Sequence, residues 1–306
     1  MELRLENICK SFNSKQVLKN VNFKLSSGQA LGYLGRNGAG KTTTIRILAD
    51  IFRADSGKVL LDNKPIDYNT ISVGYLPEER GLYPKSVVGE QMVYIGELRG
   101  MARKEAKKSA ANLLEELEAS EYWGKKLETL SKGNQQKIQL ATALLHNPDI
   151  VILDEPFSGL DPVNASLLKK LIVKEVNKGK VVLFSSHQMP YVEEFCEYIC
   201  IINKGEIVID GKIKDIKQSY PRNRIAVSPE GEPNAFLKDL SGLENWQRVV
   251  SHAQVKGCDL EITLKKPQEK AALLQMLVDL PMGVDLVKVI EPTLEEIFVE
   301  KAGGSE

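Results

Sequence analysis

The glycine-rich stretch GRNGAGKTT, residues 35–43, limits the possible folds of this chain more than any other segment. It matches the pattern G-x-x-x-x-G-K-[ST], in which glycines let backbone N–H groups turn toward a phosphate. The apolar run ALGYLG precedes it, and KTTTIRILAD follows with apolar residues at the helical spacing of Ile45, Leu48 and Ala49. A strand, a glycine loop and a helix in this order begin an α/β unit, and the helix N-terminus favours an anion.

Two side chains at the end of this stretch distinguish a phosphate loop from an ordinary tight turn. By itself, a glycine-rich stretch before a helix is also compatible with an ordinary tight turn. Here Lys41 can reach the β- and γ-phosphates of a nucleotide, and the Thr42 hydroxyl can ligate Mg²⁺. We therefore predict a nucleotide-binding loop made by Gly35, Asn37, Gly38, Ala39, Gly40, Lys41, Thr42 and Thr43.

Two adjacent carboxylates end the apolar run IVILDEP at 150–156. Asp154 is expected to hold Mg²⁺ through a water, and Glu155 to polarise the water that attacks the γ-phosphate. The alternative is a pair of solvated side chains at a strand end. His187 closes a second apolar run and could fix the γ-phosphate and the attacking water, although a lone histidine there can also be a turn residue.

The chain alternates between strands and helices up to about residue 211, which predicts an α/β fold. Near-continuous β-branched runs at 150–153 and 181–184 indicate strands buried on both faces, as in a parallel sheet. We predict helices within 88–119, before the first of these strands, at 162–177, between them, and at 189–199, after the second. A β-hairpin is predicted at 204–211.

The pattern changes after QSYPRN, residues 218–223. The next elements follow the order βαββαβ, which is typical of a small α+β ferredoxin-like module. They are strands at 224–227, 248–255, 259–264 and 284–290, with helices at 234–240 and 268–280. A final helix, TLEEIFVEKA, comes after them. We therefore predict two domains, 1–220 and 221–306.

Composition narrows the possible partners and location of the chain. Basic and acidic residues balance at 41 each, so there is no electrostatic argument for a nucleic-acid partner. The longest apolar runs are far shorter than the roughly 18 residues of a membrane-spanning helix. The first residues, MELRLENICKSF, alternate apolar and polar side chains and lack the apolar core of a secretion signal, so we expect a cytoplasmic chain.

The four cysteines are scattered through the sequence. Cys196 and Cys200 have the i, i+4 spacing of one helix face, but no second pair or histidine cluster accompanies them. Buried structural thiols are therefore favoured over a metal site.

Taken together, these motifs resemble the nucleotide-binding subunit of ABC transporters over residues 1–220. Residues 35–42 resemble Walker A, 150–154 with Glu155 resemble Walker B, SGLD at 158–161 resembles the D-loop, and His187 resembles the switch histidine. The resemblance implies a P-loop NTPase core with an antiparallel β subdomain and a helical subdomain. It also implies ATP and Mg²⁺ as cofactors and ATP hydrolysis as the activity.

The stretch LSKGNQQK, residues 130–137, occupies the position of the family signature. By resemblance, Ser131 and Gly133 bind the γ-phosphate of an ATP held by the opposite subunit, so two chains enclose two nucleotides head to tail. Both a second copy of this chain and a different ATPase are compatible with these motifs. Lys132 and Asn134 depart from the usual Leu-Ser-Gly-Gly-Gln, but the serine and the second glycine remain.

Two further positions follow from the resemblance. In VGYLPEERGLYP, residues 73–84, Glu78 stands where the family carries a glutamine that contacts Mg²⁺, and a carboxylate keeps the oxygen ligand while losing the amide donor. This variant resembles a subgroup of bacterial exporter ATPases, including sodium-extrusion systems. Phe12 matches the aromatic residue that stacks on adenine, and its alternative is a core aromatic at a strand end.

The leading hypothesis is an ATPase subunit that drives a separate membrane permease and lies on the inner face of the membrane through that permease. A soluble ABC ATPase of translation or DNA repair is the alternative. Such proteins carry two cassettes or a long coiled coil, and neither is visible in this sequence. A protein that binds ATP but scarcely hydrolyses it would lack Glu155, which is present. The 224–302 segment is expected to be a regulatory or dimer-contact module.

Overall fold

The computed structural model describes residues 1–79 and 81–303. They form two compact units, one made of residues 1–213 and the chain from Ile297 onward, the other of 214–296. The sequence placed the whole of 221–306 in the second domain, whereas the last helix, α11 (Leu294–Ala302), joins the first unit from Ile297. Ile297 and Ala302 are buried, and the Asn203 side chain donates a hydrogen bond to the Lys301 carbonyl.

One sheet of the first unit is antiparallel, with strand order β2-β1-β4-β5. Alternating apolar residues such as Leu3 and Leu5 are buried on one face of it, as expected for a sheet with one solvated face. This is the predicted antiparallel subdomain. Its strands are β1 (Glu2–Phe12), β2 (Lys15–Ser26), β4 (Ser56–Leu61) and β5 (Lys64–Pro65).

The second sheet has the order β10-β9-β3-β8-β7-β6, and its strands are parallel except for β10, which pairs antiparallel with β9. Every residue of β7 and β8 is buried, which confirms the prediction of a parallel core. The strands are β3 (Gln29–Leu34), β6 (Val73–Leu76), β7 (Ile150–Asp154), β8 (Val181–Ser185), β9 (Tyr198–Asn203) and β10 (Glu206–Lys212). Their carboxyl ends share one edge, where ligands of such sheets bind.

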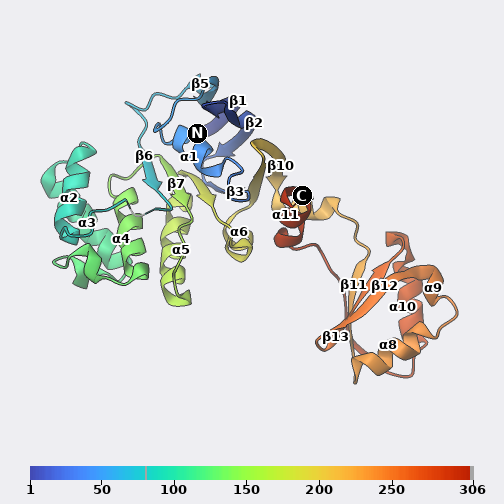
Figure 1. Ribbon diagram of the computed structural model, residues 1–306. Helices are drawn as coiled ribbons and strands as arrows, with labels where there is room; N and C mark the ends of the chain where they lie inside the picture. The colour runs from blue at the N-terminus through green and yellow to red at the C-terminus, as the bar shows by residue number, and fades with distance from the viewer. Residues whose placement is uncertain (80, 304–306) are drawn as a thin grey trace. The chain divides into compact units, whose positions relative to one another are not determined.

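Helices α1, α5 and α6 lie beside this sheet, whereas α2, α3 and α4 form a separate group (Figure 1). The latter three pack against one another and make the predicted helical subdomain. The helices of the first unit before α7 are α1 (Lys41–Leu48), α2 (Val88–Leu98), α3 (Arg103–Glu116), α4 (Lys132–Leu144), α5 (Pro162–Asn177) and α6 (Met189–Phe195). The last of these ends four residues before the sequence predicted.

The second unit has the predicted βαββαβ order, preceded by one short helix and with a second short helix before its second strand and a 3-10 turn before its last long helix. Its sheet order is β12-β13-β11-β14. All of its strand pairs are antiparallel. Its own core contains Val227, Phe236, Leu260 and Ile262. Its elements are α7 (Ile213–Ser219), β11 (Arg224–Pro229), α8 (Pro233–Ser241), α9 (Trp246–Val249), β12 (Val250–Lys256), β13 (Asp259–Leu264), α10 (Lys270–Val278) and β14 (Val284–Val289).

Within the described ranges, none of these helices is both long enough and apolar enough to span a bilayer.

Candidate functional site

The loop between β3 and α1 is shaped by glycines at positions where a side chain would be strained or would clash. Gly38 and Gly40 have φ of 77° and 113°, in the left-handed region that other residues rarely adopt. A Cβ on Gly35 would lie 2.6 Å from the Ile202 carbonyl oxygen, and one on Gly40 would lie 2.7 Å from Leu18. The loop therefore turns tightly against β9 and β2, and Gly40 serves as the N-cap of α1.

Lys41 folds back over this loop from the first position of α1. Its Nζ donates hydrogen bonds to the carbonyl oxygens of Gly35, at 2.5 Å, and Arg36, at 3.3 Å. Burial lowers the pKa of the Lys41 ammonium, and the carboxylates of Glu155, Asp154 and Glu78 oppose that shift. The structure thus brings the predicted lysine and the three predicted acidic residues within electrostatic range of each other.

Asp154 ends β7 as a buried carboxylate with one free oxygen. The register of the two parallel strands pairs it with Ser185, whose hydroxyl donates a hydrogen bond to Asp154 Oδ1. Asp154 Oδ2 is also buried and has no hydrogen-bond partner within the described parts of the chain. Burial raises the pKa of this carboxyl, and the Ser185 hydrogen bond opposes the shift. An oriented carboxylate oxygen, with the Thr42 hydroxyl at the start of α1, suits the oxygen ligands that Mg²⁺ requires.

Glu155 is held by the backbone and by two side chains that follow β8. Its φ of 51° lies in the left-handed region, and its N–H donates to the Ser185 carbonyl at 3.1 Å. Glu155 Oε2 accepts a hydrogen bond from the Ser186 hydroxyl at 3.3 Å and lies 2.9 Å from His187 Nδ1. Burial raises the pKa of Glu155, and the His187 hydrogen bond opposes that shift. The carboxylate is 6% exposed and the imidazole 67%, so the pair joins a buried base to an accessible side chain.

Ser131 caps the N-terminus of α4. Its hydroxyl accepts a hydrogen bond from the Asn134 N–H at 3.3 Å, while the Asn134 side chain donates to the Tyr122 hydroxyl at 2.8 Å. Asn134, which replaces the glutamine of the usual family signature, thus has a structural role within the helical subdomain. A Cβ on Gly133 would lie 3.3 Å from Leu160 of the SGLD loop, so the helix start and that loop are closely packed.

The remaining predicted residues lie where a nucleotide could reach them. Asn37 is exposed and Thr43 half-buried, and Glu78 is exposed on the loop after β6. Phe12 is 41% exposed at the end of β1, and its ring meets Phe52 edge-on with centroids 5.5 Å apart. An exposed ring face is available for stacking, which leaves the assignment of Phe12 to adenine a prediction.

Several residues that shape the site were not predicted from the sequence. Ser185 and Ser186 position the two carboxylates, and the Gln136 side chain donates to the Pro156 carbonyl at 3.1 Å, tying α4 to the end of β7. Both serines directly precede His187, so an assumed parallel register between the two strands would have placed Ser185 opposite Asp154. The role of Gln136 depends on tertiary packing and has no signal in the local sequence.

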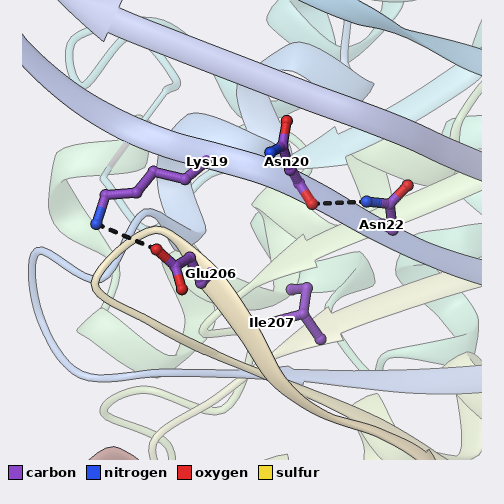
Figure 2. A pocket seen from close by; sticks show the side chains of 5 residues that line it. All are labelled: Lys19, Asn20, Asn22, Glu206 and Ile207. Atoms are coloured by element: carbon purple, nitrogen blue, oxygen red, sulfur yellow. Dashed lines mark hydrogen bonds and ion pairs between the residues drawn. The ribbon is translucent and has the colours of Figure 1, made fainter.

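Two other features lie apart from this site. A shallow surface groove lined by Lys19, Asn20, Asn22, Glu206 and Ile207 contains none of the predicted site residues (Figure 2). The four cysteines are free thiols, with Cys196 and Cys200 buried as predicted.

A phosphate loop after β3, a buried carboxylate pair at the end of β7 in the same parallel sheet and a serine-capped helix define an ATP-binding cassette. Comparison with known proteins agrees. The family model "ABC transporter" matches residues 18–158, a model for the C-terminal domain of DrrA1-3-like ATP-binding proteins matches 211–302, and an AAA domain model (putative AbiEii toxin, Type IV TA system) matches 126–192. The chain belongs to the ATP-binding proteins of ABC transporters, a family that hydrolyses ATP.

Individual relatives extend over almost the whole chain. The uncharacterised ABC transporter ATP-binding protein YhaQ of Bacillus subtilis is 39% identical over 98% of this chain and 98% of its own length. The linearmycin resistance ATP-binding protein LnrL of the same species is 31% identical with the same coverage. Among solved structures, the dimeric bacterial ABC transporter cassette MJ0796 has a TM-score of 0.63 at 26% identity, covering 69% of this chain and 98% of that one.

Proposed function

We propose that this chain is the ATP-hydrolysing subunit of an exporter and that it drives a membrane permease carried on a separate chain. One observation carries the catalytic part of this proposal. The buried Glu155 carboxylate is held by Ser186 and His187, in electrostatic range of Lys41 at the phosphate loop. A buried base beside a phosphate loop is the arrangement that activates water for attack on a γ-phosphate.

In this proposal each residue has a separate task. Lys41 leaves its carbonyl partners in the loop to bind the β- and γ-phosphates, and the loop amides bind the β-phosphate. Glu155 accepts the proton of the attacking water, and its raised pKa makes it a better acceptor than an exposed carboxylate. His187, which is exposed and already in contact with Glu155, orients that water and the γ-phosphate.

Magnesium fits the residues at this position. Asp154 Oδ2 is buried without a partner in the described structure, and the Thr42 hydroxyl begins α1 on the same edge of the sheet. We propose that these two residues and Glu78 hold the ion. When bound, it would neutralise the charge that develops on the phosphates.

The active assembly that we propose contains two ATPase subunits. Ser131 caps α4, an element separate from the phosphate loop, and its exposed position lets it serve a nucleotide on another chain. The cassette MJ0796 was solved as a dimer, which supports this arrangement. The second subunit could be a copy of this chain or a related ATPase.

The direction of transport is inferred from likeness. The relative LnrL is named for linearmycin resistance, which is consistent with moving a compound out of the cell. The loop LPEERGLYP adds a resemblance to exporter ATPases. We also propose that the chain lies in the cytoplasm, where its permease holds it on the inner face of the membrane.

Affinity purification of the tagged chain from detergent-solubilised membranes, followed by mass spectrometry, tests the partnership. Recovery of a polytopic membrane protein in stoichiometric amount is the expected result. As a control, the same purification is done with Glu128→Gln, an exposed change on the 3-10 turn before α4. Recovery of only soluble partners or of ribosomes would instead support a non-transport ABC ATPase.

A further inference from the structure

The turn between β9 and β10 is bonded directly to the phosphate loop. Lys204 and Gly205 form it with φ of 48° and 84°, the positive values of a tight hairpin turn. The Gly205 N–H donates a hydrogen bond to the Ala39 carbonyl at 2.9 Å, and the Gly205 carbonyl accepts one from the Lys19 N–H at 2.8 Å. A single residue therefore joins the phosphate loop to β2 through main-chain atoms.

This junction leaves no room for a side chain. A Cβ on Gly205 would meet the Val17 carbonyl oxygen far inside van der Waals contact. On the strand leading into the turn, Ile202 fills the space against the phosphate loop, because Cβ atoms on Gly35 and Gly40 would lie 2.8 Å and 3.1 Å from its side chain. A substitution at Gly205 must therefore displace the turn and the loop that rests on it.

The surface pair beside the turn contributes less than these main-chain bonds. Figure 2 shows Lys19 reaching from β2 to Glu206, the first residue of β10, with Nζ and Oε1 3.3 Å apart. Both side chains are largely exposed, at 41% and 60%. Exposed ion pairs contribute little to stability, so the position of the turn depends on Gly205.

The other side of the turn is bonded to the last helix of the chain. Asn203, the final residue of β9, donates from Nδ2 to the Lys301 carbonyl in the last turn of α11 at 3.3 Å. The first turn of α11 is fixed within the second unit, where the Arg224 guanidinium bonds both Glu296 carboxylate oxygens at 2.9 and 3.0 Å. The Glu296 carboxylate also accepts from the Thr293 N–H at 2.9 Å. One helix thus begins in the C-terminal module and ends against the turn that supports the phosphate loop.

We propose that Gly205 is a positioning residue for the phosphate loop and that α11 acts on this position through Asn203, so that the C-terminal module regulates nucleotide affinity. The proposal rests on the proposed function, because it assumes that the loop binds ATP. α11 crosses the boundary between the two units, so a change in the second unit can reach the Lys301 carbonyl along the helix and alter its hydrogen bond to the turn. The path follows α11 from Glu296 to Lys301, crosses the hydrogen bond to Asn203, follows the backbone of the turn to Gly205 and crosses its hydrogen bond to Ala39.

The test measures nucleotide affinity and turnover separately. Gly205→Ala is expected to raise the KM for ATP and the Kd for ADP about tenfold, because the loop that binds phosphate is displaced. Turnover at saturating ATP should stay within about twofold of wild type, because Asp154 and Glu155 are untouched. Asn203→Ala, which removes only the bond to α11, should move KM in the same direction by about two- to fivefold.

Gly179→Ala is the matched control. Gly179 has nearly the same φ, 81°, and a Cβ there would meet nothing within 4 Å, so the control carries the backbone strain without the contact to the phosphate loop. It should lose stability and keep the wild-type KM. Equal KM values for Gly205→Ala and wild type would overturn the positioning role. An effect at Gly205 without one at Asn203 would overturn the link to α11.

A measurement on the wild-type chain covers the case in which Gly205→Ala does not fold. Hydrogen exchange at the amides of Gly205 and Lys19 should slow when ADP binds, because nucleotide immobilises the loop to which they are joined. Unchanged exchange at both amides would contradict the proposal. A wild-type chain that binds no nucleotide at all would instead contradict the proposed function, so the two failures are distinguishable.

Discussion

His187 Nδ1 lies 2.9 Å from Glu155 Oε2, and this contact joins a side chain that is 67% exposed to one that is 6% exposed. The carboxylate is thus shielded from water while it interacts electrostatically with Lys41 of the phosphate loop. In the proposed mechanism, water activation depends on Glu155, and His187 contacts this base directly.

Replacing Glu155 by Gln should reduce ATP turnover by about 10²-fold or more, because the amide cannot accept the proton of the attacking water. ATP binding should persist, so the variant should accumulate as an ATP-bound dimer. Steady-state phosphate release and light scattering with saturating ATP measure the two effects. The exposed Glu128→Gln should retain activity, and wild-type turnover in the Glu155 variant would exclude the proposed base.

Replacing Ser185 by Ala should raise the Mg²⁺ concentration needed for half-maximal activity, because Asp154 loses the donor that orients its carboxylate. The free energy of unfolding should also fall by about 1–3 kcal/mol, the cost of leaving a buried polar group without a partner. Ser109→Ala is the matched control, since it loses a hydrogen bond to the Leu145 carbonyl away from the carboxylates. An unchanged Mg²⁺ titration in Ser185→Ala would contradict this role.

Replacing Phe12 by Ala should weaken ATP binding by about 2- to 10-fold, the range expected for losing one aromatic contact of 0.5–1.5 kcal/mol. Phe12→Tyr keeps a ring at this position and should restore the affinity. Fluorescence titration with a labelled nucleotide measures both variants. Equal affinities for the alanine and tyrosine variants would favour the alternative, in which Phe12 only packs on Phe52.

His146 should make the fold sensitive to acid. Burial lowers the pKa of its imidazole to about 4, with Arg99 and Lys180 adding to the shift and Asp149 opposing it. Between about pH 6.5 and 4 the unfolded chain binds a proton that the folded chain does not, so stability should fall as the pH falls through this window. The Val73 backbone and the Asp149 carboxylate favour the charged imidazole, but burial outweighs them, so protonation remains unfavourable in the folded chain.

Thermal unfolding between pH 7 and 4 tests this prediction. The His146→Gln variant should show a shallower loss of melting temperature over that window than wild type. His252→Gln, at an exposed position of the second unit, serves as the control. Parallel pH profiles for wild type and His146→Gln would rule out His146 as the source.

The sequence predicted the elements of the site because their chemistry is local. A glycine loop between a strand and a helix, and carboxylates at a strand end, follow from spacing alone, and they placed Lys41, Asp154 and Glu155 correctly within range of each other. Ser185 could not be assigned without the register of two strands that are separated by about thirty residues in the chain. The packing of α11 on the first unit could not be predicted, because it depends on the burial of Ile297. In the sequence, this residue cannot be distinguished from any other apolar residue of a helix.

The hydrogen bonds between Gly205, Ala39 and Lys19 run entirely through backbone atoms. Such a junction imposes almost no demand on the identity of the residues that it joins. Lys19 and Glu206 could therefore vary as related sequences diverge and the attachment would survive, whereas Lys204, with its φ of 48°, requires a residue that tolerates the left-handed region. In the sequence, the attachment is therefore marked mainly by the glycine at position 205, where any side chain would clash with β2.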